Sequence, residues 1–318
     1  MGPIVPREDG RAAAAAGSRS FRPAGLTGAL LAASMWGFAG VLAALTTCSG
    51  VTVAFWRLLI GALAYAVALA ATRRGLSIAL LRACLPGGIL FAGDIVLFFS
   101  AIKLTNIAVV SVIGALQPVV VALAARRLFG ERWTGRELAL MGVALGGVVL
   151  VVVGTEARSP DSLTGDLFAA AAMLCWSAYW IVSKRARDSH GSLEYTAGVT
   201  LVALVAVAPV TVFADQGLGH LTAGDWLPIV LIALVPGGGH LVMNWAHRYV
   251  AASLSSVVGS LSALVAAVAA VPVLGQPLSP VQLVGVAAAV GGVGLLAARR
   301  REQGPIGGEI RARSGGPA

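Results

Sequence analysis

Residues 108–147 read AVVSVIGALQPVVVALAARRLFGERWTGRELALMGVALGG, and residues 253–292 read SLSSVVGSLSALVAAVAAVPVLGQPLSPVQLVGVAAAVGG. The second stretch weakly repeats the first at one constant offset. The matched pairs are Ala108 and Ser253, Ser111 and Ser256, Gly114 and Gly259, Gly130 and Gly275, Thr134 and Ser279, Gly146 and Gly291, and Gly147 and Gly292. Each stretch carries the last two of five apolar blocks. A unit that crosses a membrane an odd number of times enters its second copy from the opposite side, so the repeat predicts two inverted halves.

The composition of the chain is that of a membrane protein. Of its 318 residues 58% are hydrophobic and 12% are charged, and the mean hydropathy is +0.86. A soluble domain carries about 25% charged residues. The apolar residues form blocks of roughly 18 to 24 residues, the length with which a helix crosses about 30 Å of hydrocarbon. Because backbone polar groups find no water there, the blocks are predicted to be helices.

We predict an all-α integral membrane protein with ten transmembrane helices, arranged as two inverted five-helix repeats. The first repeat occupies residues 25–154, with spans at 25–46, 51–71, 81–102, 107–127 and 136–154. The second occupies residues 165–298, with spans at 165–183, 195–213, 226–246, 251–274 and 281–298. Residues 155–164 form an extracytoplasmic linker, and residues 1–24 and 299–318 are expected to be disordered cytoplasmic tails.

Positive charge sets the predicted orientation. If the N-terminus is cytoplasmic, the loops on that side take nearly all of the 23 Lys and Arg residues, and only Lys103 and Arg158 fall outside. Both termini are therefore placed in the cytoplasm. The Ala- and Gly-rich composition suits a high-GC bacterium, so the expected location is a bacterial inner membrane. The net charge of +9 belongs to residues that flank apolar spans, so it indicates contact with the lipid bilayer and no binding of nucleic acid. The first span is too long for a cleaved signal peptide.

No metal, cofactor or catalytic site is expected. The cysteines, Cys48, Cys84 and Cys175, lie at different depths and show no CxxC spacing. No HExxH, DDxxD or GxSxG motif and no pair of carboxylates accompanies the spans, which argues against a membrane enzyme. The Gly-rich runs lack the context of a phosphate loop and are predicted to be helix-packing faces, among them the GxxxG pair Gly142 and Gly146.

Two ionisable residues lie inside predicted spans. Arg57 lies about 9 Å from the outer end of the second span and Asp94 about 12 Å from the outer end of the third. An ionised group at such depth costs at least about 2.5 kcal/mol and usually faces the bundle interior or a watery cavity. Three interpretations stay open: Arg57 reaches back to the outer surface, the two residues form a structural pair, or Asp94 takes part in function.

The eighth span contains a cluster of helix-loosening and polar residues. It holds Pro236, Gly237, Gly238, Gly239, His240 and Asn244. Pro and three successive glycines weaken the helical hydrogen-bond ladder, which predicts a hinge or a cavity wall. The repeat offset matches Gly239 to Asp94, which sets His240 at nearly the same depth across the bundle. His240 therefore joins Arg57 and Asp94 as a candidate coupling group, with a simple helix–helix contact as the alternative.

Aromatic residues make up only 6% of the chain, so their positions are informative. Trp36, Trp176, Tyr179 and Trp180 lie away from the ends of their spans, where an interfacial belt would place them. They could stack on an aromatic or cationic ligand, or they could fill the core. In the fourth span Gln117 precedes Pro118, whose ring is expected to kink the helix and supply a second hinge.

These residues together resemble the EamA domain of the drug/metabolite transporter superfamily. The first copy is carried by Ala101, Lys103, Ala108, Pro118, Gly130-Glu131-Arg132, Thr134 and residues 142–147, and the second by Ala246, Arg248, Ser253, Gly275 and residues 285–292. The second copy departs from the pattern where Gln276 stands in place of Glu131 and Ala263 in place of Pro118. The resemblance implies that spans one, three, four, six, eight and nine enclose a central cavity. Spans five and ten would then be peripheral, where a homodimer could form.

The resemblance implies a secondary active transporter that exports or exchanges small metabolites, either amino acids or amphipathic drugs. The residues expected around its central cavity are Trp36, Asp94, Gln117, Trp176, Tyr179, Trp180, His240 and Asn244. Alternating access would come from rocking of the two halves about that site. The alternatives are a lipid-handling protein and a channel-like facilitator, although a channel needs a ring of like residues that Arg57 and Asp94 do not supply.

Overall fold

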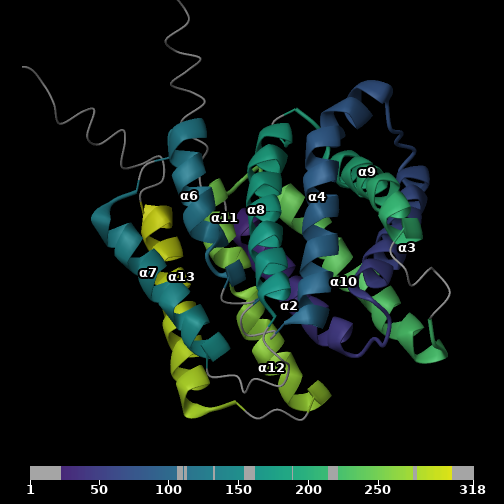
Figure 1. Cartoon of the computed structure of the whole chain (residues 1–318). Helices are drawn as coiled ribbons and strands as arrows, with labels where there is room; N and C mark the ends of the chain where they lie inside the picture. The colour runs from purple at the N-terminus through teal and green to yellow at the C-terminus, as the bar shows by residue number, and fades with distance from the viewer. Residues whose placement is uncertain are drawn as a thin grey trace, which may run out of the picture.

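The computed structural model describes residues 23–105, 110, 113–131, 133–153, 162–187, 189–213, 221–274 and 278–302, and in these ranges the chain is helical without strands (Figure 1). Its helices are α2 Pro23–Ala44, α3 Gly50–Ala71, α4 Ile78–Leu104, α6 Gln117–Leu128, α7 Gly135–Val153, α8 Leu163–Ala186, α9 Ser192–Phe213, α10 Ala223–Ala246, α11 Ala252–Gly259, α12 Ser262–Leu274 and α13 Pro280–Glu302. Eight stretches of the described chain are long and apolar enough to cross a membrane. The full set of ten spans stays a prediction.

Most helix bounds lie within about three residues of the predicted spans, and polar caps explain several differences. α4 begins ahead of its apolar block because the Ser77 hydroxyl accepts a hydrogen bond from the Leu80 N–H at 3.1 Å. α10 begins early because Thr222 and Asp225 form a capping box, in which the Thr222 N–H donates to Asp225 Oδ2 at 2.8 Å. Apolar runs alone therefore underestimate the length of these helices.

Two of the predicted continuous spans are interrupted. The predicted fourth span, 107–127, contains α6, which begins only at Gln117, and part of its remainder lies outside the described residues. The predicted ninth span, 251–274, divides into α11 and α12, with Ser260 and Leu261 between them. Gln117 and Ser262, where α6 and α12 begin, are related by the same offset as Gly114 and Gly259. The two breaks thus occupy corresponding positions in the two repeats.

The turns that lead into α7 and α13 also correspond. Before α7 the Thr134 N–H donates to Glu137 Oε2 at 2.7 Å, and the Glu137 N–H donates back to Thr134 Oγ1 at 3.3 Å. Before α13 the Ser279 N–H donates to Gln282 Oε1 at 2.8 Å, and the Gln282 N–H donates back to Ser279 Oγ at 3.3 Å. Each repeat therefore starts its last helix with a reciprocal capping box.

α7 and α13 pack side by side at one edge of the bundle, and α3 and α9 lie toward the opposite edge (Figure 1). α2, α4, α8 and α10 lie between these edges and contribute to the buried apolar clusters. Many large apolar side chains point outward, such as Val67, Leu123 and Val205. In water such a surface would favour aggregation, but in a bilayer it faces lipid tails.

Gly147 and Gly292 allow the backbones of α7 and α13 to approach closely. The glycines of the predicted GxxxG pair do not take part in this contact. A Cβ atom on Gly147 would lie 2.5 Å from the Ala289 backbone N, and one on Gly292 would lie 2.8 Å from the Ala144 backbone N. Gly142 and Gly146 instead have no atom of a neighbour within 4 Å of that position. Gly142 and Gly146 therefore do not form the α7–α13 contact, which runs along the adjacent stripe of α7. A packing role for this pair against another chain stays a prediction.

We expect Gly147→Ala to destabilise the protein by about 1–3 kcal/mol, because the added methyl group collides with the backbone of α13. Gly146→Ala is the matched control on the neighbouring residue and should be neutral or stabilising by up to about 1 kcal/mol, since Ala favours helix. Thermal unfolding of the detergent-solubilised variants measures both effects. Equal unfolding midpoints for the two variants would contradict this account of the α7–α13 contact.

Candidate functional site

The centre of the bundle holds a cluster of aromatic rings from α2, α4, α8 and α10. Trp36 on α2 lies against Trp176 on α8 and His240 on α10, each with ring centroids 5.2 Å away. Trp176 also contacts Tyr179 at 5.2 Å, and Phe91 on α4 contacts His240 at 4.7 Å. We call these five residues and Trp180 the ring cluster. Most of the aromatic residues singled out in the sequence therefore meet in space.

Arg57 enters the ring cluster from α3. Its side chain is only 5% exposed, and its Nη2 donates a hydrogen bond to His240 Nε2 at 3.2 Å. Its guanidinium carbon lies 5.7 Å from the ring centroids of both Phe91 and Phe99. Because a guanidinium can only donate, His240 accepts at Nε2 and a neutral ring carries its proton on Nδ1. Arg57 thus does not reach back to the outer surface.

Buried N–H donors without acceptors surround this centre. His240 Nδ1 and Trp36 Nε1 are both buried, and neither has a hydrogen-bond partner among the described residues. A buried polar group without a partner is uncommon and costs about 1–3 kcal/mol. Two such donors on contacting rings, beside a guanidinium, make an environment that favours an anionic or strongly accepting group.

Asp94 lies on α4, three residues after Phe91, and is partly buried. Its carboxylate interacts electrostatically with Arg57 and Tyr179. In the described part of the chain it forms neither an ion pair with Arg57 nor a hydrogen bond. The hydrogen bond of Arg57 therefore goes to His240, while Arg57 and Asp94 interact only through their charges. Whether Asp94 acts as a structural partner of Arg57 or in function stays a prediction.

Asn244 lies one helical turn beyond His240 and joins three helices. Its Nδ2 donates to Tyr179 Oη at 3.2 Å and to Thr196 Oγ1 at 3.0 Å. Its backbone carbonyl accepts from Arg187 Nε at 2.9 Å. Asn244 thus extends the polar side of the ring cluster towards one end of the bundle.

α10 remains helical through Pro236 and the three glycines. Tyr65 Oη donates to the Gly237 carbonyl at 2.8 Å, and Gly239 lies so close to α2 that a Cβ atom there would be 2.9 Å from Trp36 Nε1. Close packing against Trp36 therefore accounts for Gly239. A hinge at residues 236–239 stays a prediction.

Gln117 and Pro118 lie apart from these contacts. Pro118 occupies the first turn of α6, where a missing N–H breaks no hydrogen bond, so it begins a helix and does not kink one. Gln117 is buried with an unpartnered Nε2, but none of the ring contacts or side-chain hydrogen bonds of the described cluster includes it. Its place at the cavity stays a prediction.

Phe91 and Tyr65 were missed in the sequence, although both lie near residues that were singled out. Phe91 precedes Asp94 by three residues and Tyr65 follows Arg57 by eight, so each shares a helix face with its charged neighbour. Trp180 was expected as a ligand contact, but its Nε1 is already bonded to the Ala252 carbonyl and to Ser255 Oγ, both at 3.2 Å. Trp180 thereby connects α8 to α11.

Glu131 connects the first repeat to the second. It follows Gly130, whose positive φ of 65° forms the turn after α6. Its Oε1 accepts from the Ala252 N–H at 2.9 Å and its Oε2 accepts from Ser253 Oγ, at the N-terminus of α11. A carboxylate at a helix N-terminus is stabilised by the free N–H groups and by the helix dipole.

Cations concentrate at the same end of the bundle, which we call the basic end, defined by Arg74, Lys184, Arg187 and Arg248. Lys184 Nζ donates to the carbonyls of His247 and Val250, and Arg187 donates to Ser192 Oγ at 2.8 Å. Burial lowers the pKa of Arg187 to about 10, with Arg248 contributing in the same direction. These cations mostly bind backbone oxygens, which ties the ends of α8 and α10 together.

His247 is buried at the basic end between Trp180, Lys184 and Arg187. Its ring centroid lies 5.0 Å from that of Trp180, and neither ring nitrogen has a hydrogen-bond partner in the described ranges. Burial lowers the pKa of His247 well below its ordinary value, and the charges of Lys184 and Arg187 lower it further. His247 is therefore neutral in the folded protein.

Comparisons with known proteins agree with this architecture. The model of the EamA-like transporter family matches residues 23–153 and 163–298. The chain is 25% identical over 203 residues to the uncharacterized transporter YyaM of Bacillus subtilis, and 30% identical over 188 residues to the aromatic amino acid exporter YddG of Ancylobacter novellus. These alignments cover 62% and 56% of this chain, and 66% and 62% of the relatives, which is less than two thirds of each.

A crystal structure of similar fold superposes with a TM-score of 0.73. The match covers 89% of this chain and 100% of the other, at 22% sequence identity. At this level of identity the likeness concerns the fold alone. It agrees with the helical arrangement found in the described residues.

We expect the stability of the protein to fall as the pH falls below about 6.5, because unfolded His247 binds a proton that the folded form excludes. Between pH 7 and pH 5 this group should lower the free energy of unfolding by about 2 kcal/mol. His247→Phe keeps a ring against Trp180 and should reduce this pH dependence, as should His247→Gln. Thermal unfolding midpoints in detergent at both pH values measure the effect, and an unchanged difference between wild type and both variants would contradict it.

Proposed function

The chain belongs to the EamA-like transporter family and is a multi-pass membrane protein, and on this premise we propose that it exports or exchanges small amphipathic metabolites by secondary active transport. The observation that carries the proposal is the ring cluster with Arg57 at its centre and Asp94 beside it. Aromatic amino acids are the first substrate class to test, because the chain is similar to the aromatic amino acid exporter YddG. We place the protein in the bacterial inner membrane with both termini in the cytoplasm, following the positive charges of its loops.

The chemistry of the ring cluster suits a zwitterion that carries a ring. Arg57, with the unpartnered N–H groups of His240 and Trp36, offers donors for a carboxylate. Asp94, which has no hydrogen-bond partner in the described chain, offers acceptors for an ammonium group. Trp176 and Phe91 supply ring faces that can stack on an aromatic side chain. Each part of an aromatic amino acid would thus meet a complementary group.

Alternating access is supported by the two matched interruptions. Interrupted helices in corresponding positions of inverted repeats mark the substrate site in many transporters. Here α11 and α12 are separated at Ser260 and Leu261, and α6 begins at the corresponding position of the first repeat. Trp180 joins α11 to the ring cluster through its hydrogen bonds to Ala252 and Ser255. Rocking at these breaks would therefore move groups that contact the ring cluster.

The first experiment is counterflow of labelled tryptophan and phenylalanine into proteoliposomes, with a panel of other amino acids and metabolites beside them. We expect saturable exchange, and at least an about tenfold loss in Asp94→Asn because the ammonium group loses its charged partner. Asp166→Asn is the matched control, since Asp166 bonds to Thr105 far from the ring cluster. Measuring at two pH values tests coupling: a pH-dependent rate in wild type that is lost in Asp94→Asn would make Asp94 the proton-exchanging group.

Competition by substrate analogues separates the two charged contacts. Tryptamine lacks the carboxylate and indole-3-propionate lacks the ammonium group, so both should compete more weakly than tryptophan in wild type. In Asp94→Asn, indole-3-propionate should compete with labelled substrate as well as tryptophan does. Full exchange in Asp94→Asn would contradict the role given to Asp94. Flux that does not saturate would favour a channel-like facilitator, and no exchange across the panel would favour a lipid-handling protein.

A further inference from the structure

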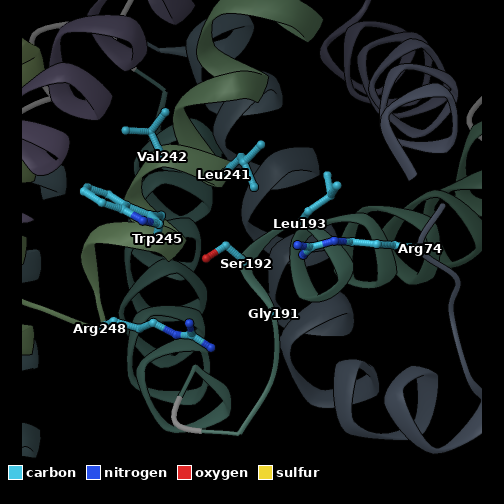
Figure 2. Close-up of a pocket in the computed structure, with 8 residues that line it drawn as sticks. All are labelled: Arg74, Gly191, Ser192, Leu193, Leu241, Val242, Trp245 and Arg248. Atoms are coloured by element: carbon cyan, nitrogen blue, oxygen red, sulfur yellow. The ribbon is translucent and has the colours of Figure 1, made fainter. Parts of the chain in front are cut away.

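A second site lies at the basic end, outside the ring cluster. There a pocket of about 450 Å³ opens between the end of α3, the start of α9 and the last turns of α10. Figure 2 shows Arg74 and Arg248 on opposite sides of this pocket, with Ser192 between them and Trp245 along one wall. We propose that this pocket binds the headgroup phosphate of an anionic phospholipid.

The charges in and beside the pocket favour an anion. Arg248 is exposed and uses Nε and Nη2 for the carbonyls of Arg187 and His190, so among the described residues its Nη1 is left for a ligand. Arg74 pairs through Nη1 with Glu194 at 3.0 Å, and its Nε and Nη2 have no partner in the same described ranges. The third arginine, Arg187, holds the hydroxyl of Ser192 at the pocket floor. The pocket and the residues directly beside it thus hold three guanidinium groups and the single carboxylate of Glu194.

The floor adds backbone donors to these side chains. α9 begins at Ser192, so the first N–H groups of the helix have no helical partner. Gly191 precedes them and lies so close to Glu194 that a Cβ atom there would collide with its carboxylate. A phosphate between Arg74 and Arg248 would meet both fixed guanidinium charge and these N–H groups, a combination typical of phosphate sites.

The apolar wall favours a lipid over a soluble anion. Leu241, Val242 and Trp245 line the pocket on one side of α10, and Trp245 is exposed in the last turn of this membrane-spanning helix. Tryptophan is enriched at membrane interfaces. The same face of α10 continues away from the pocket with exposed leucines. These are Leu234, Leu231 and Leu227. Their spacing of three and four residues makes one stripe along which an acyl chain can lie.

Basic pockets between transmembrane helices are known headgroup sites, and each cation near the surface strengthens lipid binding about fivefold. This site does not rest on the transport proposal, since none of its lining residues belongs to the ring cluster. Its occupant would nevertheless contact α10, the helix that carries Gly237 and Gly239 against Tyr65 and Trp36.

The test measures binding of phosphatidylglycerol, labelled on its acyl chain, to the detergent-solubilised full-length protein. Unlabelled phosphatidylglycerol should displace the probe, phosphatidylcholine should do so at least about tenfold more weakly, and glycerol phosphate should not displace it. Arg248→Gln and Arg74→Gln should each weaken binding about fivefold. Arg185→Gln is the matched control, because Arg185 is an exposed cation near the same end that does not line the pocket.

A variant that is expected to bind the lipid more tightly keeps the test independent of folding defects, because a misfolded protein would bind it more weakly. Glu194→Gln removes the carboxylate that occupies Arg74, so it should tighten phosphatidylglycerol binding by a few-fold. Thermal unfolding of each variant confirms that it is folded. Equal weakening by Arg185→Gln would show only diffuse attraction to the basic end, and displacement by glycerol phosphate would identify a soluble anion as the occupant. Unchanged phosphatidylglycerol binding in Arg74→Gln, Arg248→Gln and Glu194→Gln would contradict the proposed site.

Discussion

The buried guanidinium of Arg57 is the group around which the centre of the bundle is arranged. A cation in such a place is costly unless it is paired or hydrogen-bonded. Here the available carboxylate, Asp94, does not bond to it, and the partners are instead the ring nitrogen of His240 and the faces of Phe91 and Phe99. The arrangement stabilises Arg57 only in part. It leaves positive charge, unpartnered N–H groups and a carboxylate within one small region of the described chain, and these are the features on which the proposed binding of a zwitterion depends.

The sequence predicted most of the helices well, because the hydropathy of each residue, taken along the chain, is enough to locate a membrane-spanning segment. Apolar runs located the spans, and the Lys and Arg residues that flank these runs marked the loops. Partners across the bundle were harder to predict, since Arg57 could meet either Asp94 or His240 at nearly the same depth, and only packing decides between them. Gly147 and Gly146 pose the same difficulty: they are adjacent, and the rotation of α7 determines which one meets α13. Phe91 and Tyr65 could have been found by following the helix face of each charged residue.

The breaks before α6 and between α11 and α12 were not predicted, for a related reason. Pro118 suggested a kink in one continuous span, yet a proline in the first turn of a helix is compatible with a fresh start. In the second repeat no proline marks the break, because Ala263 stands at the matching position. Ser260 instead donates its hydroxyl to the Val257 carbonyl, which satisfies an oxygen near the end of α11. The same discontinuity is therefore built from different residues in the two halves.

The contacts of Glu131 bear on the relative free energies of the states that open to the two sides of the membrane. Its carboxylate fastens the turn after α6 to the start of α11, whereas the repeat offset sets the uncharged Gln276 at the matching position of the other half. Two inverted halves of identical sequence would give states of equal free energy open to either side. Under the proposed alternating access, a carboxylate that caps α11 in one half, with a neutral residue at the matching position of the other half, would remove that degeneracy and favour the state in which Glu131 bonds to Ala252 and Ser253. Such a bias would alter how often each side of the site is open, while the sign of net flux would still follow the gradients across the membrane.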